Sequence, residues 1–132
     1  MKYLIDTHVC LWAIANKEKL SLKVRDILED FKTQILLSQV SLMEITIKLQ
    51  LGKLKDFEVS LPEFIDAVTN TGFEILPLKN EHFLTYLKFD FPERHRDPFD
   101  RFLIATSLFE GASLISKDEK FKMYANKLKI IW

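Results

Sequence analysis

Cysteine, glycine and proline are scarce in this chain, and neither sign of charge prevails. The 132 residues include one Cys, three Gly and four Pro, and 19 basic residues balance 19 acidic ones. The single cysteine, Cys10, excludes an internal disulfide and suits a reducing cytosol; we expect it to be a small buried residue. Few glycines and prolines leave little room for linkers. Net neutrality excludes an overall basic footprint for nucleic acid but leaves a local basic patch open.

Long hydrophobic runs are absent as well. No segment contains the roughly 18 consecutive apolar residues that a membrane span needs. The first apolar stretch meets an acid at Asp6, so we expect no signal-peptide core. Hydrophobic residues make up 48% of the chain and include eleven Phe and two Trp, which is enough for a core. We therefore expect one compact cytoplasmic domain over residues 1–132, without contact to a membrane.

Short apolar runs alternate along the chain with segments of helical periodicity. The predicted strands cover residues 3–5, 34–38, 73–77, 112–116 and 128–132. The predicted helices cover residues 9–15, 22–31, 40–51, 60–72, 80–89, 98–110 and 121–125. Because the strands are continuous apolar runs, both of their faces should be covered. This alternation predicts a three-layer α/β/α domain with a mostly parallel central sheet.

Two acids fall where such sheets form their sites, outside the carboxyl ends of the strands. Asp6 comes directly after the first predicted strand, and Asp118 comes two residues after the fourth. A carboxylate at this position is costly to desolvate unless it is paired or bound to a metal ion. The alternative for each acid is an ordinary capping role. Asp6 would cap the helix that starts near Val9, and Asp118 would cap the short helix predicted over residues 121–125.

Glu44 interrupts the apolar helix predicted over residues 40–51. Its neighbours on the same face are Val40 and Ile47, and the helix looks apolar nearly all round, so an exposed face is hard to find. A buried carboxylate in such a helix points to function. The alternative is a plain ion pair with Lys48, one helical turn further on.

Two more acids mark the start of the helix over residues 98–110. Asp97 fits the N-cap position, Pro98 the first turn and Asp100 the third helical position. Both acids satisfy free amide groups and the helix dipole, so capping alone would explain them. Taken together with Asp6 and Glu44, they predict a cluster of carboxylates.

Clustered carboxylates repel and raise one another's pKa unless a cation neutralises them. Their oxygen atoms suit Mg²⁺ or Mn²⁺ rather than Zn²⁺, and such ions can activate water for attack on a phosphodiester. We interpret His8 and His95 as contacts to phosphate or substrate, and His82 as a surface residue. No glycine-rich phosphate loop and no nucleophile elbow is present.

Four segments carry a resemblance to a known family. They are Leu4-Ile5-Asp6-Thr7-His8, Ser41-Leu42-Met43-Glu44-Ile45, the stretch from Arg96 to Ala105 (RDPFDRFLIA), and the stretch from Leu114 to Phe121 (LISKDEKF). In their order and placement, these segments resemble a PIN domain and, more narrowly, the VapC-type toxins of bacterial type II toxin–antitoxin systems. The resemblance spans essentially the whole chain.

The resemblance implies a small metal-dependent endoribonuclease that cuts RNA and inhibits translation. It also implies a homodimer that a cognate antitoxin protein holds inactive. By position in the family pattern, the catalytic acids are Asp6, Glu44, Asp100 and Asp118. Asp6 and Asp100 would hold Mg²⁺ or Mn²⁺, with Asp118, Glu44 and Asp97 as further candidates. Asp97 would mainly cap its helix, and Ser116 would hold a carboxylate or a water in place.

Two other classes place acids at the ends of parallel strands. A magnesium-binding, non-catalytic receiver-like signalling domain needs an acid after a middle strand, where this chain has Ser38 and Gln39. A phosphatase with an aspartate nucleophile usually has a second acid two residues on, where this chain has His8.

A neutral RNA-binding protein also needs a local basic rim. The candidates for that rim are Arg94, Arg96, Arg101, Lys48 and Lys53.

Overall fold

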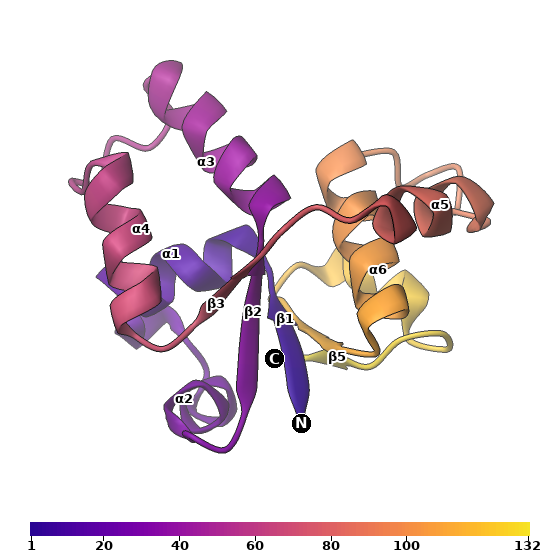
Figure 1. Cartoon of the computed structure of the whole chain (residues 1–132), viewed down its shortest axis with the longest axis horizontal. Helices are drawn as coiled ribbons and strands as arrows, with labels where there is room; N and C mark the ends of the chain where they lie inside the picture. Colours follow the sequence, from indigo (N-terminus) through magenta and orange to yellow (C-terminus); the bar gives the residue numbers. More distant parts are fainter.

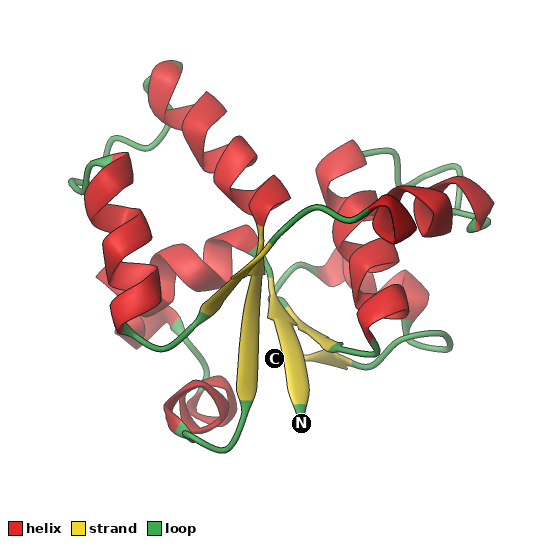
Figure 2. Cartoon of the chain, viewed as in Figure 1, coloured by secondary structure: helices red, strands yellow, loops and turns green.

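Five parallel strands form the centre of the molecule, and helices cover both faces of the sheet (Figures 1 and 2). The computed structural model describes the whole chain, Met1–Trp132. The strands are β1 (Lys2–Ile5), β2 (Gln34–Ser38), β3 (Glu74–Leu76), β4 (Ser113–Ile115) and β5 (Ile130–Ile131). They lie in the order β3-β2-β1-β4-β5, and each neighbouring pair is parallel. The predicted three-layer α/β/α class is confirmed.

The helices follow the strands in alternation, as predicted. The α-helices are α1 (Thr7–Ala15), α2 (Leu22–Glu29), α3 (Gln39–Gln50), α4 (Leu61–Asn70), α5 (Asn80–Lys88) and α6 (Pro98–Glu110). Two short 3₁₀ helices, η1 (Lys17–Lys19) and η2 (Glu119–Tyr124), complete the set. The helix expected over residues 121–125 is therefore a 3₁₀ segment that begins earlier. None of the helices combines the length and apolarity needed to cross a membrane.

Successive strand residues point to opposite faces, and this alternation builds two separate cores. Tyr3 and Ile5 of β1 pack into the larger core with residues of α1, α2 and α4. Leu4, between them, packs into the smaller core with residues of α6 and η2. The same division holds along β2, where Leu36 faces the smaller core and its neighbours face the larger one. Because both faces are buried, the strands are continuous apolar runs.

Three expectations about burial were wrong. The helical periodicity of residues 22–31 does not lead to burial at either end of this segment, because Leu22 is 76% exposed and Phe31, which lies beyond the end of α2, is 91% exposed. Helix α3 is not apolar all round in its setting, since Met43 and Ile47 lie at the surface. His82, expected at the surface, is fully buried and contacts Glu110 with its Nε2 at 2.8 Å. Periodicity shows which residues share a face, but neighbouring elements decide whether that face is covered.

Candidate active site

The candidate site lies at the carboxyl ends of β1 and β4, where the order of the strands reverses. From β1 the chain builds outward to β2 and β3 on one side and to β4 and β5 on the other. In open parallel sheets such a switch point leaves a crevice for ligands. Asp6 directly follows β1, and Asp118 follows β4. A hollow of about 280 Å³ opens over these two aspartates, and His8, Trp12 and Lys117 also line it.

Asp6 is buried and held by hydrogen bonds on both carboxylate oxygens. As the N-cap of α1, its Oδ1 accepts from the Thr7 amide at 2.7 Å, and its Oδ2 accepts from the Ser116 hydroxyl at 2.7 Å. Ser116 also accepts from the Asp118 amide at 3.0 Å, so its hydroxyl joins the two strand ends. It holds a carboxylate in place, as the resemblance implied. Burial raises the pKa of Asp6, while the bond from Ser116 and the charge of His8 act to lower it. Asp6 thus caps a helix and faces the hollow as well.

Glu44 approaches Asp6 from α3 through one intervening residue. The Thr7 hydroxyl donates to Glu44 Oε1 at 2.8 Å and is also hydrogen-bonded to the Ser41 hydroxyl at 2.9 Å. The ion pair with Lys48 also forms, with Lys48 Nζ 2.9 Å from Glu44 Oε2. Contrary to expectation, α3 does have an exposed face, and Glu44 is only partly buried. Glu44 nevertheless lies close enough to Asp6 for its charge to act on the pKa of Asp6.

Asp97 and Asp100 lie at the start of α6 but have different surroundings. Asp97 Oδ1 accepts from the amides of Phe99 and Asp100, at 2.9 and 3.1 Å, and so caps α6. Asp100 instead faces the other acids. Burial, followed by the charges of Asp97, Asp6, Asp118 and Glu44 in that order, raises the pKa of Asp100 to about 7. The structure therefore gathers all five acids into one electrostatic cluster.

His95 supports Asp100 from behind. It is 2% exposed, so the expectation that it contacts substrate was wrong. Its Nε2 lies 3.2 Å from Asp100 Oδ2, and its Nδ1 lies 2.5 Å from the Tyr124 hydroxyl. Burial lowers the pKa of His95 and raises that of Tyr124. In the tautomer in which the Tyr124 hydroxyl donates to Nδ1, the Nε2–H donates to Asp100.

The donor set fits a hard divalent cation. The facing groups of the cluster are carboxylate oxygens. Burial and, after it, the charges of the neighbouring acids raise the pKa of Asp100, and a bound cation would offset both effects. Nowhere do three or more His, Cys, Asp or Glu side chains converge closely enough to form a complete protein cage. Mg²⁺ commonly uses only one or two carboxylates and completes its six ligands with water. A site of this kind therefore needs no complete protein cage.

The basic residues named from the sequence mostly serve the fold. Arg101 donates from Nη2 to the Pro92 carbonyl at 3.2 Å and from Nε to the His95 carbonyl. Lys48 pairs with Glu44, and Arg94 and Arg96 contact neighbouring residues of the chain. Only Lys53 lines a hollow next to the site. The other lysines that line this hollow, Lys19 and Lys55, were not predicted from the sequence, because the hollow brings together distant segments.

The comparison with protein families identifies the fold. The sequence model of the PIN domain matches residues 3–127. The chain belongs to the PIN domain family. A search of curated protein sequences finds no match.

Solved structures agree in fold over nearly the whole chain. VapBC2 from Rickettsia felis, bound to a DNA fragment from its promoter, gives a TM-score of 0.67 at 18% identity, over 98% of this chain and 97% of that chain. DNA-bound VapBC from Salmonella typhimurium gives 0.68 at 15% identity, over 98% and 96%. VapBC-5 from Mycobacterium tuberculosis, a member of the VapBC family of toxin–antitoxin systems, gives 0.65 at 14% identity, over 98% and 97%. At such identities the likeness shows a shared fold.

Proposed function

We propose that this protein is a metal-dependent endoribonuclease and the toxin of a type II toxin–antitoxin system. The observation that carries the proposal is the gathering of Asp6, Glu44, Asp100 and Asp118 at the switch point of a PIN-domain sheet. The likeness to VapBC structures supports the narrower reading as a VapC-type toxin. The substrate would be RNA, and cleavage of that RNA in the cytoplasm would stop translation.

In this proposal, Asp6 and Asp100 hold Mg²⁺ or Mn²⁺, and Asp118 and Glu44 complete the acidic cluster, in part through water. When bound, the cation would lower the pKa of a coordinated water and offset charge on the scissile phosphate. Other residues of the chain hold the carboxylates of Asp6 and Asp100 in position. Ser116 and the Thr7 amide fix both oxygens of Asp6. His95 fixes one oxygen of Asp100, and Asp97 fixes the first turn of α6 that carries it.

The test is incubation of the purified protein with total RNA, with Mg²⁺ or Mn²⁺ and with a chelator. Asp100→Asn should lose activity, because it removes a charge that the cation needs. Asp97→Asn should keep most of it, because asparagine caps a helix about as well as aspartate. Asp26→Asn, an exposed change on α2, is the control for handling. Cleavage that survives the chelator, or full activity of Asp100→Asn, contradicts the proposal.

We propose two protein partners. The first is a cognate antitoxin that covers the site, supported by the VapBC complexes that share this fold.

The second proposed partner is another copy of this chain. Helices α3 and α5 leave large apolar side chains at the surface, and these are Met43, Ile47, Phe83, Leu84 and Leu87. Leu87 is the most exposed of these side chains, at 81%, so its substitution is the best test of a dimer interface on this surface. Sedimentation should give the mass of two chains for the wild type and of one chain for Leu87→Glu.

The receiver-like alternative finds no support in the fold of the site. A phosphoacceptor carboxylate is needed after a middle strand, and β2 ends at Ser38, whose hydroxyl accepts from the Val40 amide to cap α3. The position is therefore occupied by an ordinary capping serine. Incubation with a small phosphodonor and Mg²⁺ should leave the protein unphosphorylated.

A further inference from the structure

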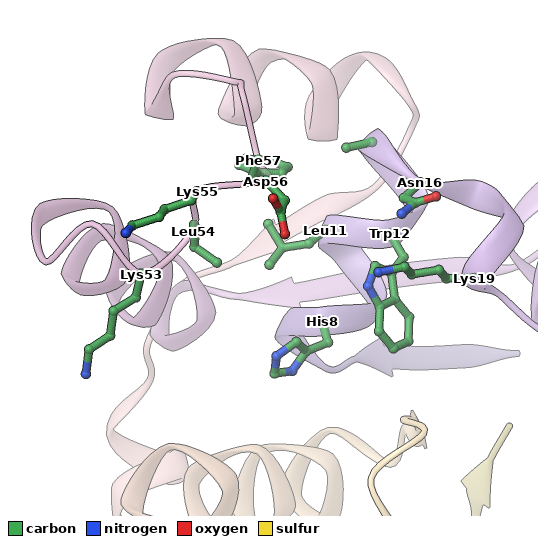
Figure 3. A pocket seen from close by; sticks show the side chains of 11 residues that line it. His8, Leu11, Trp12, Asn16, Lys19, Lys53, Leu54, Lys55, Asp56 and Phe57 are labelled. Carbon is green, nitrogen blue, oxygen red and sulfur yellow. The ribbon is translucent and has the colours of Figure 1, made fainter.

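A groove beside α1 continues from the acidic hollow. It has a volume of about 360 Å³ and is lined by residues of α1, by Lys19 of η1 and by the loop that follows α3. Figure 3 shows Lys53 to Phe57 on one side of the groove, with His8, Trp12 and Lys19 on the other. His8 and Trp12 also line the hollow over Asp6 and Asp118. Because the two depressions share these side chains, one ligand can occupy both.

The charge of the groove is opposite to that of the acidic cluster. Lys19, Lys53 and Lys55 line it, against one acid, Asp56. Lys117 stands where the groove meets the acidic hollow. All four lysines are exposed, and none of them forms an ion pair within the chain. In a protein without net charge, this is a local cationic track that starts at the site.

An aromatic platform lies in the same track. Trp12 is half-buried, with Trp132 packed edge-on at 5.8 Å between ring centroids. Lys19 Nζ and Lys117 Nζ each lie 5.8 Å from the centroid of the Trp12 ring. Aromatic rings combined with a basic groove are what proteins use to hold single-stranded nucleic acid, with bases stacked on the rings and phosphates next to the lysines.

We propose that this groove binds single-stranded RNA on one side of the scissile phosphate. One base stacks on Trp12, and the phosphates beyond it follow Lys19, Lys53 and Lys55. The proposal rests on the proposed ribonuclease function and adds where the substrate lies. It also explains how a polyanion approaches a cluster of carboxylates, since the lysines attract the flanking phosphates and bring the scissile one to the acids.

The first test measures binding without cleavage. A fluorescent single-stranded RNA of about 12 nucleotides, within the usual site size, is titrated against protein carrying Asp100→Asn, in chelator. Adding Lys53→Glu and Lys55→Glu should weaken binding at least about tenfold and reduce the slope of log affinity against log salt by about 1.4. Lys23→Glu with Lys32→Glu, an equal charge change near the other end of the sheet, should leave both quantities almost unchanged.

The second test addresses Trp12 itself. In the same background with Trp132→Phe, Trp12 is the single tryptophan, so its fluorescence should be quenched as RNA binds. Trp12→Ala should weaken binding about tenfold, and Trp12→Phe should restore most of it, because a phenyl ring still stacks. The rescue by phenylalanine separates stacking from a general loss of fold.

The outcomes separate this proposal from the proposed function. If the wild type cleaves RNA but the Lys53, Lys55 and Trp12 variants bind RNA like their parent, the groove does not hold RNA. A segment of a partner protein would then be its occupant. If the wild type neither binds nor cleaves RNA in Mg²⁺ or Mn²⁺, the ribonuclease function itself is wrong. A loss of affinity confined to the Lys23 and Lys32 control would also overturn the groove assignment.

Discussion

Replacing Asp100 by asparagine should stabilise the metal-free protein above pH 7 while it removes nuclease activity. The pKa of Asp100 is about 7 in the folded chain, against about 4 for an aspartate in an unfolded chain. The folded state therefore holds this proton more tightly, and its stability falls as pH rises from about 4 to about 7. Above pH 7 the folded protein carries the full cost of burying this charge next to the other acids. Asparagine is uncharged and keeps an oxygen that can accept from His95.

The size of the effect follows from the shift and from the solvent around the group. Three pKa units correspond to about 4 kcal/mol at most. The Asp100 side chain is 19% exposed, and water screens part of the repulsion, so about 1–2 kcal/mol is a sounder expectation. With a urea dependence of about 2 kcal/mol per molar, the midpoint at pH 8 should rise by roughly 0.5–1 M.

The assay is urea unfolding in chelator at pH 4 and pH 8, with Asp26→Asn as the matched control. Asp100→Asn and the wild type should unfold at nearly equal urea concentrations at pH 4 and at clearly different ones at pH 8. An Asp100→Asn protein that is no more stable than the wild type at pH 8 would refute the view that the acids strain the metal-free fold.

The remaining predictions concern the cation and the groups around the site. Mn²⁺ at pH 8 should raise the wild-type urea midpoint but not that of Asp100→Asn; an equal rise in both would mean that the ion binds elsewhere. Ser116→Ala should cost about 1–3 kcal/mol, because the buried Asp6 carboxylate loses its hydroxyl donor, and RNA cleavage should fall with it; unchanged unfolding and cleavage would contradict this role. Glu110→Gln should lower stability by about 1–3 kcal/mol at neutral pH but spare cleavage, since Glu110 pairs with Lys79 and His82 away from the site. Because those partners lower the pKa of Glu110, its contribution is lost as pH falls through that pKa, so the two proteins should converge in stability in acid.

Capping and site formation are not competing roles in this fold. Asp6, Asp97 and Asp118 each accept a backbone amide at the start of a helix, α1, α6 and η2 respectively. Helix N-termini carry partial positive charge, which stabilises carboxylates placed there. Several helix starts meeting at one edge of the sheet can therefore hold acids that would otherwise repel one another. From the sequence, capping was expected as the alternative to a role in the site. In the structure the same aspartates both cap helices and belong to the acidic cluster.

The residues alone determined the elements and most of the acidic cluster. Apolar runs bounded by polar residues predicted five strands. The helix start predicted at Asp97 was correct because hydrogen bonds within a few residues form this cap. Acids directly after parallel strands meet at one edge in any such sheet. Asp6 and Asp118 were predictable for that reason, and Glu44 was singled out because it interrupts an apolar helix. The resemblance to a PIN domain separated Asp100 from Asp97.

Only the tertiary structure decided which faces are covered and which distant groups meet. The surface position of Met43, the burial of His82 behind α6 and the exposure of Phe31 depend on elements far away in the chain. So do the hydrogen bond between Tyr124 and His95 and the groove that Lys53 and Trp12 both line. Local patterns record the period and the ends of an element. Burial and pKa depend on what packs across from it, which no local pattern contains.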